Sequence, residues 1–351
     1  MRKPWSRAYE ELTEIAQERG FLVGWSPLAL PSAYRERYAA WLEAGSHAGM
    51  GYLAERWQER MEPSRRFSWA KSAMVLAAPL PLEDPDPPPG GLRVGRVARY
   101  AWIGDYHALI EPHLRALEAR AAELGLQALG YVDYGPLPER SYAAQAGLGW
   151  IGCNGMLLST QAGSALLLAV LLTSLEVPLP PLHPPRCGRC TRCLATCPTG
   201  ALRGDGTLDA RLCLSYWTVE HRGLIPVELW PALGDWLLGC DLCQEACPWD
   251  RKRVLPWPGF EPRPELAHPN LEDFFFLSSR AFARRYAQTA FLRPGRARMA
   301  RNALIVLANH GETYRSFIEM ARRDPHPLVQ ATALQALAWL NRGSVPAGGP
   351  R

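Results

Sequence analysis

Apolar and polar positions alternate between helical and strand-like spacing through the first half of the chain. Residues 5–19 and 109–124 carry apolar side chains at helical spacing, so each stretch predicts an amphipathic helix. Short apolar runs at 73–80 and 128–132 predict buried strands. The run 164–175 predicts a central strand or, because it is rich in Leu and Ala, a helix. This alternation indicates an α/β or α+β domain.

From Leu271 onward the spacing is helical only, with predicted helices at 297–309, 313–323 and 328–340. Short helices separated by turns such as Asp324-Pro325 are typical of helical repeats.

Prolines in residues 178–185 interrupt any regular element, which predicts a linker at this point of the chain. We place domain boundaries near residues 176, 250 and 280. The resulting segments are 1–175, 176–250, 251–280 and 281–351.

The 351 residues are 48% hydrophobic and 21% charged, which excludes a disordered or fibrous protein. The start of the chain has no apolar stretch of the kind found in signal peptides. The longest apolar run, 165–172, is far shorter than the roughly 20 residues that cross a bilayer. We therefore expect a cytoplasmic protein without a membrane partner, in which clustered thiols are metal ligands or catalytic groups rather than disulfides.

The net charge of +5 is unevenly distributed. Residues 251–351 hold 16 Lys and Arg against 7 Asp and Glu, a balance of +9, whereas residues 1–250 have a balance of −4. Residues 274–311 contain no acid, and such a run can follow a phosphate backbone or form a solvated helical face. Its seven arginines are Arg280, Arg284, Arg285, Arg293, Arg296, Arg298 and Arg301.

Eight of the nine cysteines form two runs with the spacing of a bacterial two-cluster ferredoxin. The first run has the pattern Cys-x-x-Cys-x-x-Cys-x-x-x-Cys-Pro, in which the fourth cysteine binds the other cluster. This interleaving predicts one 4Fe–4S cluster on Cys187, Cys190, Cys193 and Cys247. It predicts a second on Cys197, Cys213, Cys240 and Cys243. Paired structural zinc sites are the alternative, although the duplicated Cys-Pro runs fit them poorly.

Three further features have an ordinary structural interpretation beside a functional one. Residues 147–152 match a dinucleotide-binding fingerprint, but a helical pattern precedes them where a strand is required. Asp105-Tyr-His107 resembles the start of a cobalamin-binding motif whose glycine is here Ile110, so we expect His107 to be an ordinary hydrogen-bonded histidine. We expect Cys153 to be a buried, inert thiol.

Asp133 follows the apolar run 128–132 and precedes a turn. A carboxyl group at a strand end beside apolar neighbours can be desolvated, which suits it to hold a proton near neutral pH and to donate it. The alternative is a capping or turn aspartate.

Taken together, these motifs resemble those of the epoxyqueuosine reductases, which are relatives of the reductive dehalogenases. The resemblance spans nearly the whole chain. It also departs from the family at one point, because Cys153 stands where the family often has lysine. The matching segments are 105–107, 132–136, 146–154, the two cysteine runs, 213–223 and Arg301-Asn302.

The resemblance implies an enzyme that uses cobalamin and two 4Fe–4S clusters to reduce the epoxide of epoxyqueuosine at the tRNA wobble position. It implies that Asp133 is the proton donor. An external electron donor, contact with the anticodon stem-loop and a monomeric state are also expected. The implied corrin pocket includes Arg60, Asp133, Leu157, Leu168, Ser215 and Asp241. The implied tRNA contacts are Arg284, Arg285, Arg293, Arg296, Arg298 and Arg301.

The implied fold is α+β. A reductive-dehalogenase-like, cobalamin-binding α/β domain would occupy residues 1–175, and a ferredoxin-like two-cluster module residues 176–250. Residues 251–280 would connect this module to HEAT-like helical repeats that bind tRNA in residues 281–351.

Two other functions remain open at this point. A corrinoid reductase acting on small molecules leaves the basic C-terminal helices unexplained. An electron carrier without catalytic activity leaves residues 1–175 unexplained.

Overall fold

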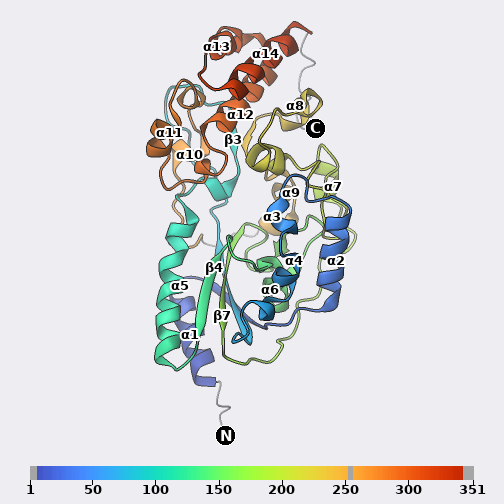
Figure 1. The fold of residues 1–351 in the computed structure, drawn as a ribbon, viewed down its shortest axis with the longest axis vertical. Helices are drawn as coiled ribbons and strands as arrows, with labels where there is room; N and C mark the ends of the chain where they lie inside the picture. The colour runs from blue at the N-terminus through green and yellow to red at the C-terminus, as the bar shows by residue number, and fades with distance from the viewer. Residues whose placement is uncertain (1–5, 252–255, 343–351) are drawn as a thin grey trace.

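The computed structural model describes residues 6–251 and 256–342 and has a four-stranded antiparallel sheet at its centre (Figure 1). The sheet order is β1-β2-β7-β4, so β4 is an edge strand. Both central strands consist almost entirely of apolar residues, which suits strands with neighbours on both sides. The strands are β1 (Leu22–Pro27), β2 (Ser72–Pro79), β4 (Ala128–Val132) and β7 (Leu166–Thr173).

The predictions of strands at 73–80 and 128–132 are confirmed. The ambiguous run 164–175 is a strand, because β7 pairs with β2 from Ser72↔Thr173 to Pro79↔Leu166. That pairing satisfies the backbone groups of both strands over their whole length, which local propensity cannot reveal.

Helices cover both faces of the sheet (Figure 1). The predicted helices at 5–19 and 109–124 are α1 (Ser6–Glu18) and α5 (Tyr106–Glu123), which pack together against one face. Leu12 of α1 and Leu117 of α5 are fully buried there. The shorter helices α2 (Ser32–Glu43), α3 (Gly51–Ala54), α4 (Trp57–Met61) and α6 (Glu139–Gln145) lie on the other side.

The cysteine-rich region consists of short elements after the irregular stretch 178–185, where the prolines interrupt regular structure as predicted. Helices α7 (Arg192–Thr196) and α9 (Leu242–Glu245) pack against each other. Two small sheets complete this part of the fold. One pairs β3 (Arg96–Val97) with β8 (Trp236–Leu238), and the other pairs β5 (Trp150–Ile151) with β6 (Leu157–Leu158).

The C-terminal region is helical, as predicted from Leu271 onward. The predicted helix at 313–323 is shorter than expected, because a 3-10 turn at Gly311–Tyr314 precedes its α-helical part. The α-helices of this region are α11 (Ser279–Arg285), α12 (Arg296–Asn309), α13 (Arg315–Ala321) and α14 (Pro327–Asn341). Two short helices, α8 (Trp230–Leu233) and α10 (Pro264–Ala267), precede this region.

A single apolar core joins these helices to the cysteine-rich region. It contains Val97 of β3 and Leu237 of β8 together with Ile305 of α12 and Ala333 of α14. The helical region therefore does not have a core of its own. Among the described residues, no helix combines the length and apolar character needed to cross a membrane.

Candidate functional site

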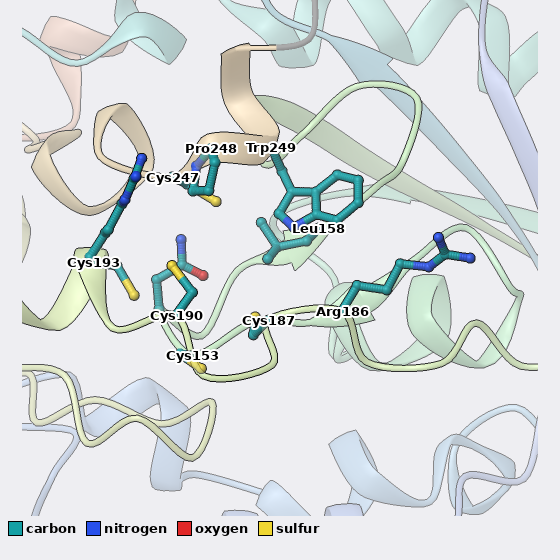
Figure 2. A pocket seen from close by; sticks show the side chains of 11 residues that line it. Cys153, Leu158, Arg186, Cys187, Cys190, Cys193, Cys247, Pro248 and Trp249 are labelled. Carbon is teal, nitrogen blue, oxygen red and sulfur yellow. The ribbon is translucent and has the colours of Figure 1, made fainter.

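Five thiols line one cavity of about 80 Å³ (Figure 2). Four of them are the set predicted for the first cluster, and Cys153 is the fifth. Cys187 and Cys190 come from the loop before α7, Cys193 lies in α7, and Cys247 follows α9. The packing of α7 against α9 thus brings together cysteines that are more than fifty positions apart in the chain.

Aromatic rings form part of the wall of this cavity. The Trp150 indole packs edge-on against Trp249, with 5.1 Å between ring centroids, and its Nε1 donates a hydrogen bond of 3.4 Å to the Cys187 Sγ. Hydrogen bonds to ligand sulfurs and exclusion of water both tune iron–sulfur clusters. The four side chains predicted to bind a cluster here all offer a sulfur atom, which suits an iron–sulfur cluster.

The second predicted set, Cys197, Cys213, Cys240 and Cys243, also comes together. Burial, followed by the nearby thiols of Cys213 and Cys197, raises the pKa of Cys240 to about 12. Burial and the nearby Cys240 and Cys213 likewise raise the pKa of Cys243. Four such thiols are difficult to ionise without a compensating cation, so the donor set fits a metal cluster that binds thiolates.

The expectation that the Cys153 thiol is buried is wrong. It is half-buried and lines the cavity of the first set, because the turn between β5 and β6 carries it there. Burial and the neighbouring Cys187 raise the pKa of Cys153 to about 11.

Asp133 lies directly after β4 and has φ +60°, the left-handed conformation that aspartate tolerates better than most residues. Its Oδ2 accepts a 2.7 Å hydrogen bond from the hydroxyl of Tyr106, the first residue of α5. The carboxylate is exposed, which contradicts the expected desolvation by apolar neighbours. The physical reason is that the pairing of β4 with β7 ends at Val132, so no neighbouring strand covers the side chain of Asp133.

Tyr100 links Asp133 to the second cysteine set. Burial, followed by the carboxylates of Asp241 and Asp133, raises the pKa of the Tyr100 hydroxyl. Asp241 adjoins Cys240, a predicted cluster ligand, in the sequence. The Tyr100 phenol is therefore influenced both by Asp133 and by a carboxylate next to the second cysteine set. No sequence pattern singles out Tyr100, and Tyr106 is part of the 105–107 motif without a role of its own being predicted.

Arg99 is a second residue that sequence reasoning missed. Its Nε and one terminal nitrogen are buried and have no hydrogen-bond partner. Burial raises the pKa of Asp241 and of Asp250, and the nearby Arg99 charge opposes both shifts. Buried guanidinium nitrogens normally have acceptors, so these two fit a bound group that presents oxygen atoms here.

The remaining residues of the predicted corrin pocket have different surroundings. Arg60 donates a 3.2 Å hydrogen bond to the Leu137 carbonyl and so supports the turn after Asp133. Leu157 points into the apolar core, which contradicts a cofactor contact through its side chain, and Leu168 is half-buried beside the same core.

Ser215 and Asp241 lie in the cysteine-rich region. Ser215 is half-buried and precedes a turn of π-helix at Tyr216–Glu220. The carboxylate of Asp241 is buried and accepts a 2.8 Å hydrogen bond from the backbone amide of Arg99.

The acid-free arginine run does not form one free basic face. Arg296 is 5% exposed, and both its terminal nitrogens bind Asp324 at 2.8 Å. Arg301 is 0% exposed and donates to the carbonyls of Trp217, His221 and Gly223. The prediction of tRNA contacts through these two side chains is therefore wrong, because both guanidinium groups are used inside the protein.

The other arginines of the run differ in how available they are. Arg298 donates to the backbone carbonyls of residues 219 and 220, Arg293 pairs with Glu220, and Arg285 pairs with Asp273. Arg280 and Arg284 are exposed, and neither makes an ion pair or side-chain hydrogen bond within the described residues.

The glycine-rich run 147–152 belongs to the β5–β6 hairpin. Helix α6 precedes it and a strand follows, which confirms the predicted context and differs from a dinucleotide-binding turn. A Cβ atom on Gly149 would lie 1.9 Å from the Leu158 carbonyl oxygen, so close packing of the hairpin requires glycine there. His107 bonds to Asp105, the N-cap of α5, through Nδ1 at 2.8 Å, as expected of a hydrogen-bonded histidine.

Two family profiles match the chain. Residues 186–250 match a 4Fe–4S double cluster binding domain, which decides between clusters and zinc in favour of clusters. Residues 60–134 match the profile described as "Epoxyqueuosine reductase QueG, DUF1730".

Similar proteins cover nearly the whole chain. The epoxyqueuosine reductase of Pseudomonas aeruginosa is 35% identical over 88% of this chain and 87% of its own length. That of Escherichia coli is 32% identical over 94% of this chain and 89% of its own length.

Solved structures agree with these sequence matches. The epoxyqueuosine reductase of Streptococcus thermophilus has a TM-score of 0.87 at 30% identity, covering 95% of this chain and 90% of that one. An epoxyqueuosine reductase crystallised with an epoxyqueuosine-modified tRNA-Tyr stem loop also has a TM-score of 0.87, at 29% identity, covering 96% and 91%.

Proposed function

The chain belongs to the epoxyqueuosine reductase family, and on that premise we propose that it reduces epoxyqueuosine to queuosine at the wobble position of a tRNA anticodon. The observation that carries the proposal is the arrangement around Tyr100. The Tyr100 ring lies edge-on to Tyr106, with 6.4 Å between ring centroids, and the Tyr106 hydroxyl donates to Asp133. The backbone amide of Arg99, one residue before Tyr100, donates to Asp241, which adjoins Cys240 of the second set. A proton source and an electron-transfer group thus flank one region.

The eight cysteines are assigned to two 4Fe–4S clusters. The first is held by Cys187, Cys190, Cys193 and Cys247, which share one cavity. The second is held by Cys197, Cys213, Cys240 and Cys243, whose thiols influence one another's ionisation. Cys153 is not needed as a ligand, because each set is complete without it.

Cobalamin is the proposed cofactor between Asp133 and the second cluster. The unpaired nitrogens of Arg99 supply hydrogen-bond donors for its oxygen atoms, and Asp241 accepts a hydrogen bond from the Arg99 amide. Ser215, two residues after the cluster ligand Cys213, is a further proposed contact. Leu168 adds an apolar surface, and Arg60 supports the turn that follows Asp133. When bound, cobalamin supplies a strongly reducing metal centre for the epoxide carbon.

Asp133 donates a proton to the epoxide oxygen as its C–O bond breaks, because an unprotonated alkoxide is a poor leaving group. Tyr106 positions the donor through its hydrogen bond to Oδ2. The overall change consumes two electrons and two protons, removes the oxygen as water and leaves an alkene.

The tRNA anticodon stem-loop is the proposed macromolecular substrate. The relative crystallised with a modified stem loop supports it, as do the exposed Arg280 and Arg284 of α11. Arg285, Arg293 and Arg298 can contribute positive potential, although each has a partner within the protein. A flipped wobble base would have to enter the site beside Asp133.

The proposed organisation keeps a catalytic domain at 1–175, a two-cluster module at 176–250, a connector at 251–280 and HEAT-like helices at 281–351. A cytoplasmic monomer that receives electrons from an external donor completes the proposal. The test is anaerobic incubation of the reconstituted enzyme with reductant and epoxyqueuosine-modified stem loop, followed by mass analysis of the nucleosides. Loss of one oxygen atom from the modified nucleoside is the expected result.

A further inference from the structure

Three arginines beside the first cysteine set form an exposed surface, which we call the cluster-one basic surface: Arg186, Arg189 and Arg192. None of the three makes an ion pair or side-chain hydrogen bond within residues 6–251 and 256–342. The chain from residue 177 to residue 204 contains no Asp or Glu, so no local acid neutralises them. By contrast, Arg285, Arg293 and Arg296 of the C-terminal run each pair with an acid, although that run also contains none.

Exposed apolar side chains precede these arginines in the linker. Leu179 is 56% exposed and Leu182 is 57% exposed. His183, one residue further on, stacks on Trp150 with 4.9 Å between ring centroids, and Trp150 donates to the Cys187 Sγ. Apolar side chains beside unpaired arginines are the composition found at protein–protein interfaces.

This surface borders the cavity of the first cysteine set. Arg186 lines that cavity together with the cysteines (Figure 2), and Arg192 lines it as well. Cys187 and Cys190 are themselves half-buried rather than fully enclosed. The second set adjoins Asp241 and Tyr100 instead, on the side of the proposed reaction site. Electrons entering at the first set would therefore pass inward.

We propose that the cluster-one basic surface docks a small acidic electron-transfer protein, which passes single electrons to the first 4Fe–4S cluster. The inference rests on the proposed function for the presence of the clusters. The step moves one electron from the reduced centre of the carrier to the cluster, which changes from the 2+ to the 1+ state. No bond or proton is transferred.

A protein fits this surface better than RNA does. Leu179 and Leu182 offer apolar area that a phosphate backbone does not use. Helix α7, which begins at Arg192, and helix α11, which carries Arg280 and Arg284, lie on opposite sides of the molecule in Figure 1. The proposed RNA contacts and the carrier surface are thus separate.

The test uses the reconstituted protein and a plant-type 2Fe–2S ferredoxin as the acidic carrier. Stopped-flow absorption follows cluster reduction by the pre-reduced ferredoxin, and surface plasmon resonance measures binding of the oxidised ferredoxin. The variant is Arg186→Glu with Arg189→Glu. The matched control, Arg322→Glu with Arg323→Glu, makes the same charge change at two exposed arginines after α13.

At low ionic strength we expect the Arg186→Glu/Arg189→Glu variant to be reduced about 10-fold more slowly than wild type, because charge steering speeds association. The difference in rate should shrink in high salt, because added ions screen the charges on both proteins. Equal rates and equal ferredoxin binding in wild type and variant would overturn the proposal. Loss of stem-loop affinity with unchanged reduction by ferredoxin would overturn it too and assign the surface to RNA.

These measurements are independent of catalytic turnover. If the enzyme failed to reduce epoxyqueuosine, cluster reduction by ferredoxin would still show whether the surface receives electrons. Failure of the docking proposal is thereby distinguished from failure of the proposed function.

Discussion

The Tyr106 hydroxyl donates a 2.7 Å hydrogen bond to the Asp133 carboxylate and so ties the start of α5 to the residue after β4. Burial, followed by the charge of Asp133, raises the pKa of Tyr106, so its phenol stays protonated and remains a donor. Because Asp133 is exposed and has a left-handed backbone, this bond is a main constraint on where its carboxylate points. Tyr106 is therefore a positioning residue for the proposed proton donor.

Replacing Tyr106 with Phe removes this bond and keeps the ring. Without this bond the Asp133 carboxyl is no longer held in one position, so proton donation should slow while stem-loop binding should not. We expect kcat to fall about 10-fold, with KM for the stem loop and the free energy of unfolding unchanged. Steady-state kinetics and urea titration measure these quantities. A loss of stability or a rise in KM with unchanged kcat would contradict the assignment.

Alanine variants of the cysteines test the interleaved ligand sets. Cys187→Ala and Cys247→Ala should remove the same cluster, whereas Cys240→Ala should remove the other, each leaving about four of about eight iron atoms. Cys153→Ala should keep all the iron, although this thiol lines the same cavity. Iron analysis and electron paramagnetic resonance measure these outcomes. Loss of iron from Cys153→Ala would show that the sets are assigned incorrectly.

Arg296 supports the helical region rather than contacting RNA directly. Its buried pair with Asp324 is bidentate, so Arg296→Ala leaves an unpaired buried carboxylate and should cost about 3–5 kcal/mol of unfolding free energy. Arg284→Ala, at an exposed position of α11, should cost little. Urea titration compares the two variants, and a fully stable Arg296→Ala protein would argue against the structural role.

The same pair predicts a loss of stability in acid. Burial alone would raise the pKa of Asp324, but its hydrogen bonds with Arg296 hold that pKa below the ordinary value. A depressed carboxyl pKa stabilises the fold above the unfolded pKa of about 3.9, and this contribution is lost as the pH falls through the folded value. The Asp324→Asn variant should therefore have a lower free energy of unfolding than wild type at neutral pH. This gap in unfolding free energy should narrow as the pH falls below about 4. A gap that stays constant across this pH range would refute the contribution of Asp324 ionisation to stability.

Arg280 and Arg284 are the arginines of the acid-free run best placed to bind phosphate. Arg280→Glu with Arg284→Glu should weaken stem-loop binding and reduce the slope of log affinity against log salt by about 2. The Arg322→Glu/Arg323→Glu variant provides the matched charge control. Fluorescence anisotropy at several salt concentrations measures both variants. An unaltered slope in the α11 variant would exclude these two phosphate contacts.

Much of the fold could be predicted because its apolar periodicity is strong. The strands β2 and β4 and the helices α1, α5 and α12 coincide closely with stretches whose spacing alone identified them. The run that became β7 was ambiguous, since only its pairing with β2 decides for a strand. Likewise, the shared core of the cysteine-rich and helical regions depends on contacts between distant segments.

The candidate site could be predicted only where spacing itself carries the chemistry. The spacing of the cysteines predicted their two ligand sets, whereas no spacing predicted the hydrogen-bond partners of the arginines. Asp324 lies 28 positions from Arg296, and the carbonyls that accept from Arg301 lie in residues 217–223. The absence of acids near these arginines in the sequence therefore did not show whether their guanidinium groups are buried or exposed. Tyr100 and Arg99 carried no recognisable pattern, and their surroundings became evident only once the chain was folded.

The most direct test of the proposed function is queuosine formation by Asp133→Asn, a substitution that keeps the shape of an exposed side chain. Wild type and variant, both anaerobically reconstituted, receive the same reductant and epoxyqueuosine-modified stem loop, and nucleoside mass spectrometry measures the product. The variant should keep its iron, its cobalamin and its stem-loop affinity while forming queuosine about 100-fold more slowly or not at all. Queuosine formation by the variant at the wild-type rate would contradict the role of Asp133 as proton donor.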